Sequence, residues 1–450
     1  MGLATFKGGI HPYEGKELSE NRPIEVLMPK GELVYPVSQH IGAPAKPLVK
    51  KGDQVLVGQK IAEAGGFVSS HVICSVSGTV KVVEPRRMAN GSMVNSIIVE
   101  NDGEYKTIEG LGADRDADRL SKEEILGIVK EAGIVGLGGA GFPTHVKLAP
   151  KDPAKIDYVI VNGAECEPYL TSDYRLMLEE PKRIVAGLKA ILCLFEKAKG
   201  VIAVESNKPE AIACLRKASK GEARIEVLPL KTKYPQGAER NLVYAVTGRK
   251  LNSKKLPADL GCIVSNTDTV LAVGMAVCEH MPLMRRIVTV TGDAIANPQN
   301  FRVKTGTNLA ELVEAAGGFK GEPAKVIAGG PMMGMALTVL DVPVTKTTSA
   351  LLALSVDEVE QLSPTDCIRC GRCVKVCPSG LVPQKMREAC ERYDLDLFER
   401  LYGMECYECG SCTFACPARL PLTQSFKQAR KAVMERRRKA QAEKQAGGKS

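Results

Sequence analysis

The stretch CIRCGRCVKVCP, residues 367–378, decides the fold of the C-terminal part of this 450-residue chain. Its spacing, C-x2-C-x2-C-x3-C-P, is a bacterial iron–sulfur pattern, and it recurs as CYECGSCTFACP in residues 406–417. Three thiolates two residues apart can wrap a short loop around three irons of a [4Fe–4S] cube, and the fourth iron must be reached from elsewhere. Where two such runs occur together, each lends its last cysteine to the other cluster. The sequence therefore predicts two [4Fe–4S] clusters.

This exchange of cysteines assigns the ligands of each cluster. The first set is Cys367, Cys370, Cys373 and Cys416. The second set is Cys406, Cys409, Cys412 and Cys377. Structural zinc is the alternative, and zinc prefers four ligands in two paired sets. Because the whole pattern occurs twice with its proline, clusters are the favoured interpretation. Seven further cysteines lie in apolar stretches, and most of them are expected to be small buried residues: Cys74, Cys166, Cys193, Cys214, Cys262, Cys278 and Cys390.

The size and composition of the chain are those of a soluble protein with several domains. Its length suits about three domains of ordinary size, and 44% apolar with 25% charged residues is typical of a core-forming chain. No apolar run reaches the ~18 residues of a membrane-spanning helix, so we expect any membrane contact to be peripheral. The start of the chain lacks the apolar centre of a signal peptide, which favours metal ligands over disulfides for the cysteines.

The net charge of +9 is concentrated at the C-terminal end. Residues 425–450 contain nine Lys or Arg and two Asp or Glu. A nearly neutral body with a basic tail, and no tryptophan, argues against a nucleic-acid partner. The tail is either a solvated charge run or a docking segment for anionic lipid or a partner protein.

The first of five expected domains is a small β domain over residues 1–115. Short apolar runs broken by glycine turns, as in residues 47–66 and 75–85, predict its strands. These runs resemble half of a lipoyl-type barrel-sandwich domain. The exposed lysine that such carrier domains modify is missing from the intervening segment GGFVSSHVICSV, so we interpret the domain as a scaffold.

The second domain, residues 116–284, alternates helices and strands. An amphipathic helix is expected over 121–133, with Ser121 at its N-cap. The strands and helices expected after it are strands at 157–165, 201–206, 223–230 and 261–266 and helices at 181–200, 207–219 and 267–280. This alternation predicts an α/β fold with a mostly parallel sheet and ligands at the carboxyl ends of the strands.

The remaining expected domains are smaller. Residues 285–350 predict a β-rich module with one helix, and residues 351–425 predict a cluster region that is helical between and after the two cysteine runs. Residues 426–450 form the basic tail.

The glycine-rich stretch GIVGLGGAGFPTHVKL, residues 133–148, matches the loose pattern GxGxxG. A dinucleotide-binding Rossmann loop must follow a strand and open a helix. Here a helix precedes the glycines, and Pro143 and Thr144 are expected to interrupt any helix directly after them. No GKS or GKT follows, which excludes a Walker A loop. A glycine-dense backbone that presents N–H groups to a phosphate remains chemically reasonable.

Four stretches together resemble the NADH-oxidising flavoprotein subunit of respiratory complex I. GLGGAGFPTHVKL, residues 136–148, resembles its flavin-binding loop, and NGAECEP, residues 162–168, resembles its acidic loop. YPQGAE, residues 234–239, resembles its Tyr-x-x-Gly-x-Glu turn, and SNTDT, residues 265–269, resembles its Asn-Asn-x-Glu-Thr segment. The same order over about 130 residues implies a Rossmann-like FMN domain in residues 116–284.

This resemblance implies where FMN and NAD(H) bind. Its cofactor-binding residues are Gly136, Gly138, Gly139, Gly141, Lys147, Asn162, Glu165, Glu167, Tyr234, Gly237, Glu239, Asn266 and Thr267. Lys147 would meet a nucleotide phosphate, and Glu167 and Glu239 would face the nicotinamide. The chain departs from the complex I pattern at four positions: Ala164, Cys166, Ala238 and Ser265. It also carries two clusters where the complex I protein has one.

Over nearly its full length the chain resembles the RnfC family, the C subunits of Rnf ion-translocating ferredoxin:NAD oxidoreductases. The opening TFKGGIHP, residues 5–12, and the order of a barrel-sandwich-like β domain, a flavin domain, a small β-grasp-like (SLBB) module and a helical two-cluster ferredoxin region carry this resemblance. It implies a peripheral subunit on the cytoplasmic face of the membrane, among membrane-embedded and peripheral partner subunits. Ferredoxin would be an indirect electron partner.

The resemblance also implies the chemistry. NADH delivers two electrons as hydride and a cluster accepts one, so flavin plus clusters would convert between the two, in either direction. No catalytic side chain is required, because the flavin mediates the hydride transfer. Two other functions are weighed: a cobalamin reductase with the same flavin and clusters, and a flavin-less electron relay. The opening TFKGGIHP favours the RnfC family over the first, and flavin content tests the second.

Overall fold

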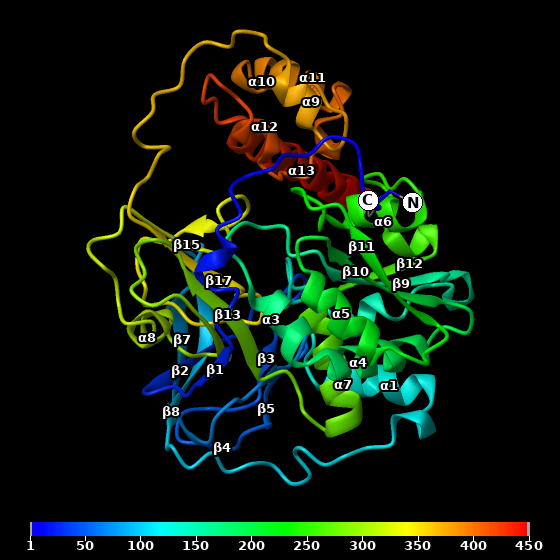
Figure 1. Cartoon of the computed structure of the whole chain (residues 1–450). Coiled ribbons are helices and arrows are strands. Elements are labelled where there is room, and N and C mark those ends of the chain that lie inside the picture. Colours follow the sequence, from blue (N-terminus) through cyan, green and yellow to red (C-terminus); the bar gives the residue numbers. More distant parts are fainter. Residues whose placement is uncertain (1, 448–450) are drawn as a thin grey trace. The chain divides into compact units, whose positions relative to one another are not determined.

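The computed structural model describes residues 2–447, so the last three residues of the basic tail lie outside the described residues (Figure 1). The chain forms two compact units. The large unit comprises Met1–Ala4, Tyr13–Thr232 and Pro257–Val356. The small unit comprises Thr5–Pro12, Lys233–Leu256 and Asp357–Ser450. Each unit is therefore built from segments that are far apart in the sequence.

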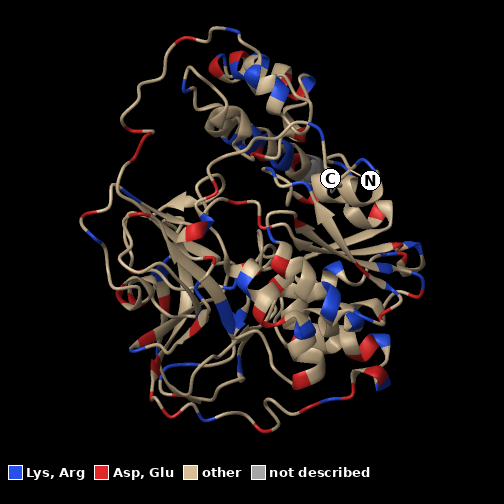
Figure 2. Cartoon of the chain, in the orientation of Figure 1, with Lys and Arg blue, Asp and Glu red and all other residues tan. Residues whose placement is uncertain are grey.

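The large unit contains the expected parallel sheet, with strand order β11-β10-β9-β12. Its strands are β9 (Tyr158–Gly163), β10 (Lys199–Glu205), β11 (Ile225–Leu230) and β12 (Cys262–Asn266). All three strand pairings are parallel, and Asn162 and Asn266 lie side by side at the carboxyl ends of β9 and β12. In Figure 2 these strands are tan along most of their length, because their charged residues lie mainly at the ends.

The helices around this sheet are α1 (Lys122–Glu131), α2 (Thr144–Lys147), α3 (Ser172–Glu179), α4 (Pro181–Leu192), α5 (Pro209–Ala218) and α7 (Thr267–Glu279). Ser121 caps α1 in a full capping box with Glu124, as its sequence predicts. Helices α4 and α7 pack so closely that a Cβ at Gly187 would lie 1.9 Å from the Val270 carbonyl oxygen. This close packing completes the apolar core of the sheet.

Two antiparallel sheets form the N-terminal barrel-sandwich. One has the order β2-β8-β7-β4 and the other β3-β5-β6. Their strands are β2 (Glu32–Pro36), β3 (Lys46–Pro47), β4 (Gln54–Val55), β5 (Lys60–Glu63), β6 (Val72–Ile73), β7 (Gly78–Arg87) and β8 (Met93–Asn101). Apolar residues from both sheets share one core, so the expected β domain is confirmed.

A six-stranded sheet with the order β1-β14-β13-β17-β15-β16 forms the third part of the large unit. Its strands are β1 (Ile24–Leu27), β13 (Arg285–Thr291), β14 (Gln299–Lys304), β15 (Lys325–Ala328), β16 (Met335–Ala336) and β17 (Ala350–Leu354), and its helix is α8 (Leu309–Ala315). Strand β1 pairs in parallel with β14 instead of joining the N-terminal barrel. The N-terminal segment is thus built into a module formed by residues near 300.

The small unit is mainly helical. Its helices are α6 (Glu239–Thr247), α9 (Arg372–Val376), α10 (Pro383–Glu391), α11 (Leu395–Arg400), α12 (Ser411–Phe414) and α13 (Leu422–Gly447). Phe426 and Val433 on α13 pack with Met386 and Phe398 in the core of this unit. The expected boundary between residues 425 and 426 therefore falls inside one continuous helix, and the first turns of the basic tail are part of the core. Short 3-10 helices complete the two units: Lys16–Leu18, Ala117–Arg119, Pro153–Lys155, Pro257–Leu260 and Gly403–Glu405.

Candidate functional site

Two hollows in the small unit are lined by the cysteines of both runs. Cys367, Cys370, Cys373 and Cys416 line the first. Cys377, Cys406, Cys409 and Cys412 line the second. Each hollow thus takes three cysteines from one run and the last cysteine from the other, which is the grouping that the spacing predicts.

The two hollows differ in their exposure. Cys367 and Cys370 of the first hollow are exposed, whereas Cys409 of the second is buried. Burial raises the pKa of Cys406 to about 11 and that of Cys412 to about 12. Such thiols give up their protons when iron binds the sulfur, because a coordinated thiol is deprotonated by the metal charge.

The grouping of the eight cysteines is the one that two clusters require. Zinc draws four ligands to about 2.3 Å from one point. Among residues 2–447, no group of three or more His, Cys, Asp or Glu side chains is arranged to hold one metal ion. The cysteines instead surround two spaces in sets of four, one cysteine for each iron corner of a [4Fe–4S] cube.

The glycine-rich loop of the large unit lies between α1 and α2. Val135 and Pro143 close it as an isolated bridge, and the Gly136 amide donates to the Phe142 carbonyl at 2.9 Å. Helix α1, and not a strand, lies directly before the loop, whereas a Rossmann loop follows a strand. The expectation that Pro143 and Thr144 interrupt a helix is wrong in one respect. Pro143 stands at the N-cap, and α2 begins directly at Thr144, since proline is tolerated at a helix start.

The tip of this loop packs against the start of α7. The Leu137 amide donates to the Thr269 hydroxyl at 2.9 Å. A Cβ on Gly138 would lie 2.8 Å from the Asn266 side-chain nitrogen, whereas a Cβ on Gly139 would meet nothing within 4 Å. The tip therefore needs glycine at 138 for close approach to Asn266, and it leaves open space above Gly139.

The ends of β9 and β12 join the glycine loop at this edge of the sheet. The Thr267 hydroxyl donates to the Asn162 carbonyl at 3.0 Å, and the Lys147 ammonium donates to the Val264 carbonyl at 2.9 Å. The buried Ser265 hydroxyl oxygen has no hydrogen-bond partner among the described residues. The glycine loop and the carboxyl ends of β9 and β12 thus meet through Gly138 and Asn266, an edge of a parallel sheet that suits a ligand such as FMN.

The acidic loop follows β9 and contains two strongly perturbed carboxyl groups. Glu165 accepts hydrogen bonds from the Asp173 amide at 2.7 Å and the Tyr174 amide at 3.3 Å through one oxygen, Oε1. Its second oxygen, Oε2, and the Oε1 of Glu167 are buried without a hydrogen-bond partner in the described chain.

Burial is the main cause of the pKa shifts at this loop. It raises the pKa of Glu165 above its usual range and that of Glu167 to about 7. The pKa of Asp173 rises to about 7, first because the group is buried and then because Glu165 and Asp268 carry like charge. Asp173 accepts a hydrogen bond from the Asn266 side chain at 2.7 Å, so it stands directly behind a predicted flavin contact.

The structure also shows residues that the sequence analysis did not single out. Asp173 lies only a few positions after the acidic loop, so its proximity could have suggested it. Lys16 and Lys208 bind backbone carbonyls of the acidic loop, but no sequence motif around either lysine indicates this contact. Lys16 is about 150 residues away in the sequence and resembles a surface lysine there.

The third flavin motif belongs to the small unit. Tyr234, Gly237 and Glu239 lie within Lys233–Leu256, and Glu239 is the first residue of α6. The Tyr234 hydroxyl donates to the carbonyl of Cys409 at 2.7 Å. The motif therefore contacts a cysteine of the second hollow, while the other three motifs meet at the sheet edge of the large unit.

The raised pKa of Glu167 predicts a pH-dependent contribution to stability. Between pH 4.5 and about 7 the folded state keeps a proton that the unfolded state has lost, so the free energy of unfolding falls as pH rises through this window. The loss of unfolding free energy from this group reaches up to about 3 kcal/mol above pH 7. Glu167→Gln should remove this slope, and denaturant unfolding of the variant and the unchanged chain from pH 4.5 to 8 measures the difference. If the unfolding free energies of the variant and the unchanged chain changed in parallel with pH, the raised pKa of Glu167 would be contradicted.

Family models match four parts of the chain. They are the RnfC Barrel sandwich hybrid domain over residues 4–104, the Nuo51 FMN-binding domain over 129–275, the SLBB domain over 287–336 and the 4Fe-4S dicluster domain over 366–420. These matches confirm the expected fold class and the order of its parts.

Relatives of known name match almost the whole chain. The C subunit of a proton-translocating ferredoxin:NAD(+) oxidoreductase complex from Clostridium ljungdahlii is 44% identical, over 87% of this chain and 88% of that protein. The C subunit of a Na(+)-translocating ferredoxin:NAD(+) oxidoreductase complex from Acetobacterium woodii is 46% identical, over 97% and 98%. The C subunit of an ion-translocating oxidoreductase complex from Rhodobacter capsulatus is 42% identical, over 96% and 84%.

Proposed function

This chain belongs to the family of C subunits of ion-translocating ferredoxin:NAD(+) oxidoreductase complexes, and we propose how its residues divide the electron transfer. The chain is the NAD(H)-reacting subunit, and it passes electrons between NAD(H) and two [4Fe–4S] clusters by way of FMN. The observation that carries this proposal is the grouping of eight cysteines into two hollows, each completed by the other run.

Flavin-binding residues in the large unit would orient the isoalloxazine ring. FMN, when bound, exchanges two electrons with NAD(H) as hydride and single electrons with the clusters. In the large unit the proposed FMN contacts are Gly136, Gly138, Gly139, Gly141, Asn162, Asn266 and Thr267. The resemblance to the complex I flavoprotein also implies Tyr234 and Gly237 as FMN contacts. Gly138 supports this role through its close approach to Asn266, and Lys147 would turn from the Val264 carbonyl toward a nucleotide phosphate.

The acidic residues would bind the nicotinamide side of NAD(H). Glu165 and Glu167 each keep one buried oxygen without a hydrogen-bond partner in the described chain, and a carboxamide can donate to such oxygens. Glu239 would contribute from the first turn of α6. These residues bind and orient the substrate and do not act as acids or bases in the hydride step.

The cluster ligands follow the two hollows. Cys367, Cys370, Cys373 and Cys416 would hold one cluster, and Cys406, Cys409, Cys412 and Cys377 the other. The amides of Leu381 and Glu408 point at the sulfurs of Cys377 and Cys406, at 3.4 and 3.3 Å. Such N–H···S bonds stabilise negative charge on a ligated sulfur and are one of the factors that tune cluster potentials.

The membrane association is indirect. Across the described helices, none is both long and apolar enough to cross a bilayer. Its relatives are C subunits of ion-translocating complexes, and we propose that this chain is likewise a peripheral subunit beside the other subunits of such a complex, with ferredoxin as an indirect electron partner. We place it at the cytoplasmic face, where ferredoxin and NAD(H) are available.

The two other functions are disfavoured by specific observations. The match to the RnfC barrel-sandwich over residues 4–104, which includes the opening TFKGGIHP, favours the RnfC family over a cobalamin reductase. The match to an FMN-binding domain over residues 129–275 argues against a flavin-less relay.

An anaerobic titration of the cluster-reconstituted full chain tests the proposal. Bound FMN and about eight irons are expected, the number that two cubes contain. Added NADH should then bleach the absorbance of both flavin and clusters. Iron without flavin binding would leave an electron relay, and flavin bleaching without cluster bleaching would refute transfer to the clusters within this chain.

A further inference from the structure

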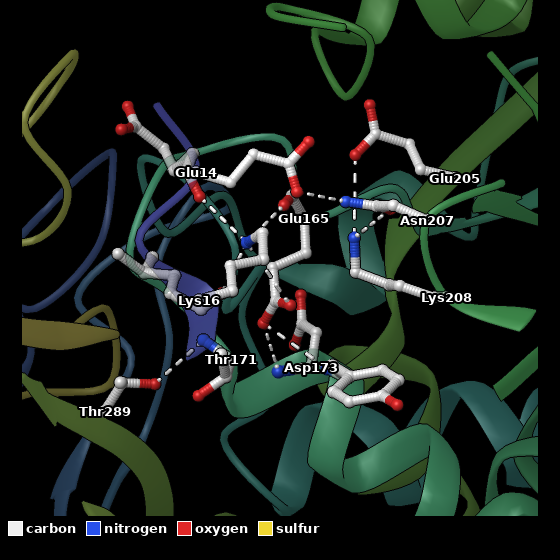
Figure 3. A network of polar contacts seen from close by, with 12 residues as sticks. Glu14, Lys16, Glu165, Thr171, Asp173, Glu205, Asn207, Lys208 and Thr289 are labelled. Carbon is white, nitrogen blue, oxygen red and sulfur yellow. Dashed lines mark hydrogen bonds and ion pairs between the residues drawn. The ribbon is translucent and has the colours of Figure 1, made fainter. Parts of the chain in front are cut away.

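The N-terminal segment of residues 13–19 crosses the acidic loop. Lys16, at the centre of this segment and near Glu165 in Figure 3, is only 6% exposed. Its ammonium donates to the carbonyls of Glu165 at 3.0 Å, Glu167 at 3.0 Å and Leu170 at 2.5 Å. An ammonium has three N–H donors, so these three carbonyls use all of them. Lys16 thus closes the loop around a single buried charge.

A second buried ammonium holds the start of the same loop. Lys208 is 2% exposed and donates to the Ala164 carbonyl at 2.8 Å and the Asn207 side-chain oxygen at 3.1 Å. Asn207 in turn donates to the Glu14 carboxylate at 2.8 Å, so both lysines belong to one network (Figure 3). Four carbonyl groups of the loop are therefore bound by two lysines from outside it.

The backbone of the segment adds further contacts. The Glu14 carbonyl accepts from the Tyr169 amide at 2.6 Å, and the Ser19 and Thr171 hydroxyls are 2.8 Å apart. Gly15 has a φ of 59°, and a Cβ there would lie 2.5 Å from the Tyr169 ring. The segment consequently fits the loop surface closely, and any side chain at Gly15 would push the loop away.

The acidic loop needs this support because its backbone is strained. Glu165 and Tyr169 have φ angles of 48° and 68°, in the left-handed region that non-glycine residues seldom adopt. Such conformations persist only where the surroundings over-determine them. The bonds from Lys16 and Lys208 lie on both sides of Glu165 and supply this constraint.

The same bonds leave one buried oxygen of Glu165 without a hydrogen bond. The Lys16 ammonium lies 3.8 Å from Oε2 of Glu165, but its protons are directed at carbonyls. Glu165 therefore has a nearby positive charge and still has an unpaired oxygen, and Glu167 has one as well. A simple ion pair between Lys16 and Glu165 would have removed this acceptor.

We propose that Lys16 and Lys208 are positioning residues that hold the acidic loop, residues 164–170, in the shape that presents Glu165 and Glu167 to NAD(H). The inference rests on the proposed function of this loop. In this proposal residues 13–19, which precede the barrel-sandwich strands, support the NAD(H)-binding loop of the α/β domain.

The test compares Lys16→Met with Lys304→Met in the full chain loaded with FMN and clusters. Lys304 is also partly buried in the large unit, but it lies beside Tyr105 and has no bond to the acidic loop. Hydrogen exchange of the amides in residues 164–174 and the KM and kcat for NADH with an artificial acceptor are measured on both variants.

Lys16→Met should speed exchange in residues 164–174 at least tenfold and raise KM about tenfold, with kcat within twofold and FMN content unchanged, because a displaced positioning group weakens binding. Lys304→Met should leave exchange and KM as they are. Unchanged exchange and KM in Lys16→Met would overturn the proposal. Faster exchange with unchanged KM would leave the lysine a purely structural role and overturn it as well.

Two further results distinguish a failure of the role proposed for Lys16 from a failure of the proposed NAD(H) site. If the unchanged chain does not bind NADH, the proposed function fails, while the exchange comparison still shows whether Lys16 orders the loop. If Lys16→Met yields no folded protein, Lys208→Met carries the same test, since it removes one carbonyl contact instead of three.

Discussion

A chain with Cys406, Cys409 and Cys412 all replaced by alanine should keep four irons, and the further change Cys377→Ala should not lower that number. The reason is the crossed arrangement of the two hollows, in which Cys377 belongs with the replaced cysteines. Once its cluster is gone, Cys377 has no ligand role left. Iron content and the EPR spectrum of the reduced, reconstituted chain measure the surviving cluster.

The matched control adds Cys416→Ala to the same triple variant. Cys416 lines the first hollow with Cys367, Cys370 and Cys373, so this change should destroy the surviving cluster or convert it to a form with fewer irons. Ligation within each run would give the opposite pair of results: Cys377→Ala would damage the cluster and Cys416→Ala would not. The two quadruple variants together therefore decide the ligand sets.

Gly138→Ala should lower FMN affinity at least tenfold and destabilise the chain by about 1–3 kcal/mol, the usual cost of overpacking. The new Cβ would lie 2.8–2.9 Å from three atoms of the Asn266 side chain. This side chain cannot move freely, because it caps α7 and donates to Asp173. Thermal unfolding without FMN and fluorescence titration with FMN measure the two effects separately.

Gly139→Ala is the matched control for this substitution. Neither glycine has a left-handed backbone, and a Cβ at Gly139 meets nothing within 4 Å. Gly139→Ala should leave the flavin-free chain as stable as before and weaken only FMN binding, since the flavin is proposed to lie over this position. Equal FMN affinity in Gly139→Ala and the unchanged chain would move the flavin away from the loop tip.

Local patterns predicted much of the fold. The strands β9, β10, β11 and β12 are short apolar runs between turn residues, and Ser121 marks the start of α1 by a capping box that needs only four residues. The cysteine runs likewise encode their pairing in their spacing. Each of these features depends on neighbours within one or two turns of the chain.

Features that depend on distant partners could not be predicted in this way. Strand β1 was expected in the N-terminal barrel, because nothing in Ile24–Leu27 distinguishes a barrel edge from the edge of another sheet. Lys16 has the sequence context of a surface lysine, and only the folded chain brings it to three carbonyls of the acidic loop. The flavin and nucleotide contacts stay predictions, as do the domain boundaries.

Strand β1 is made early but can pair only after β14 has been made, so at this end of the chain the order of folding differs from the order of synthesis. Roughly 275 residues separate the paired positions of the two strands, and a ribosome adds them in about 14–55 s at ~5–20 residues per second. During this interval β1 is already outside the ribosome, but its partner strand does not yet exist. Strand β1 is thus among the first elements to emerge and among the last to pair.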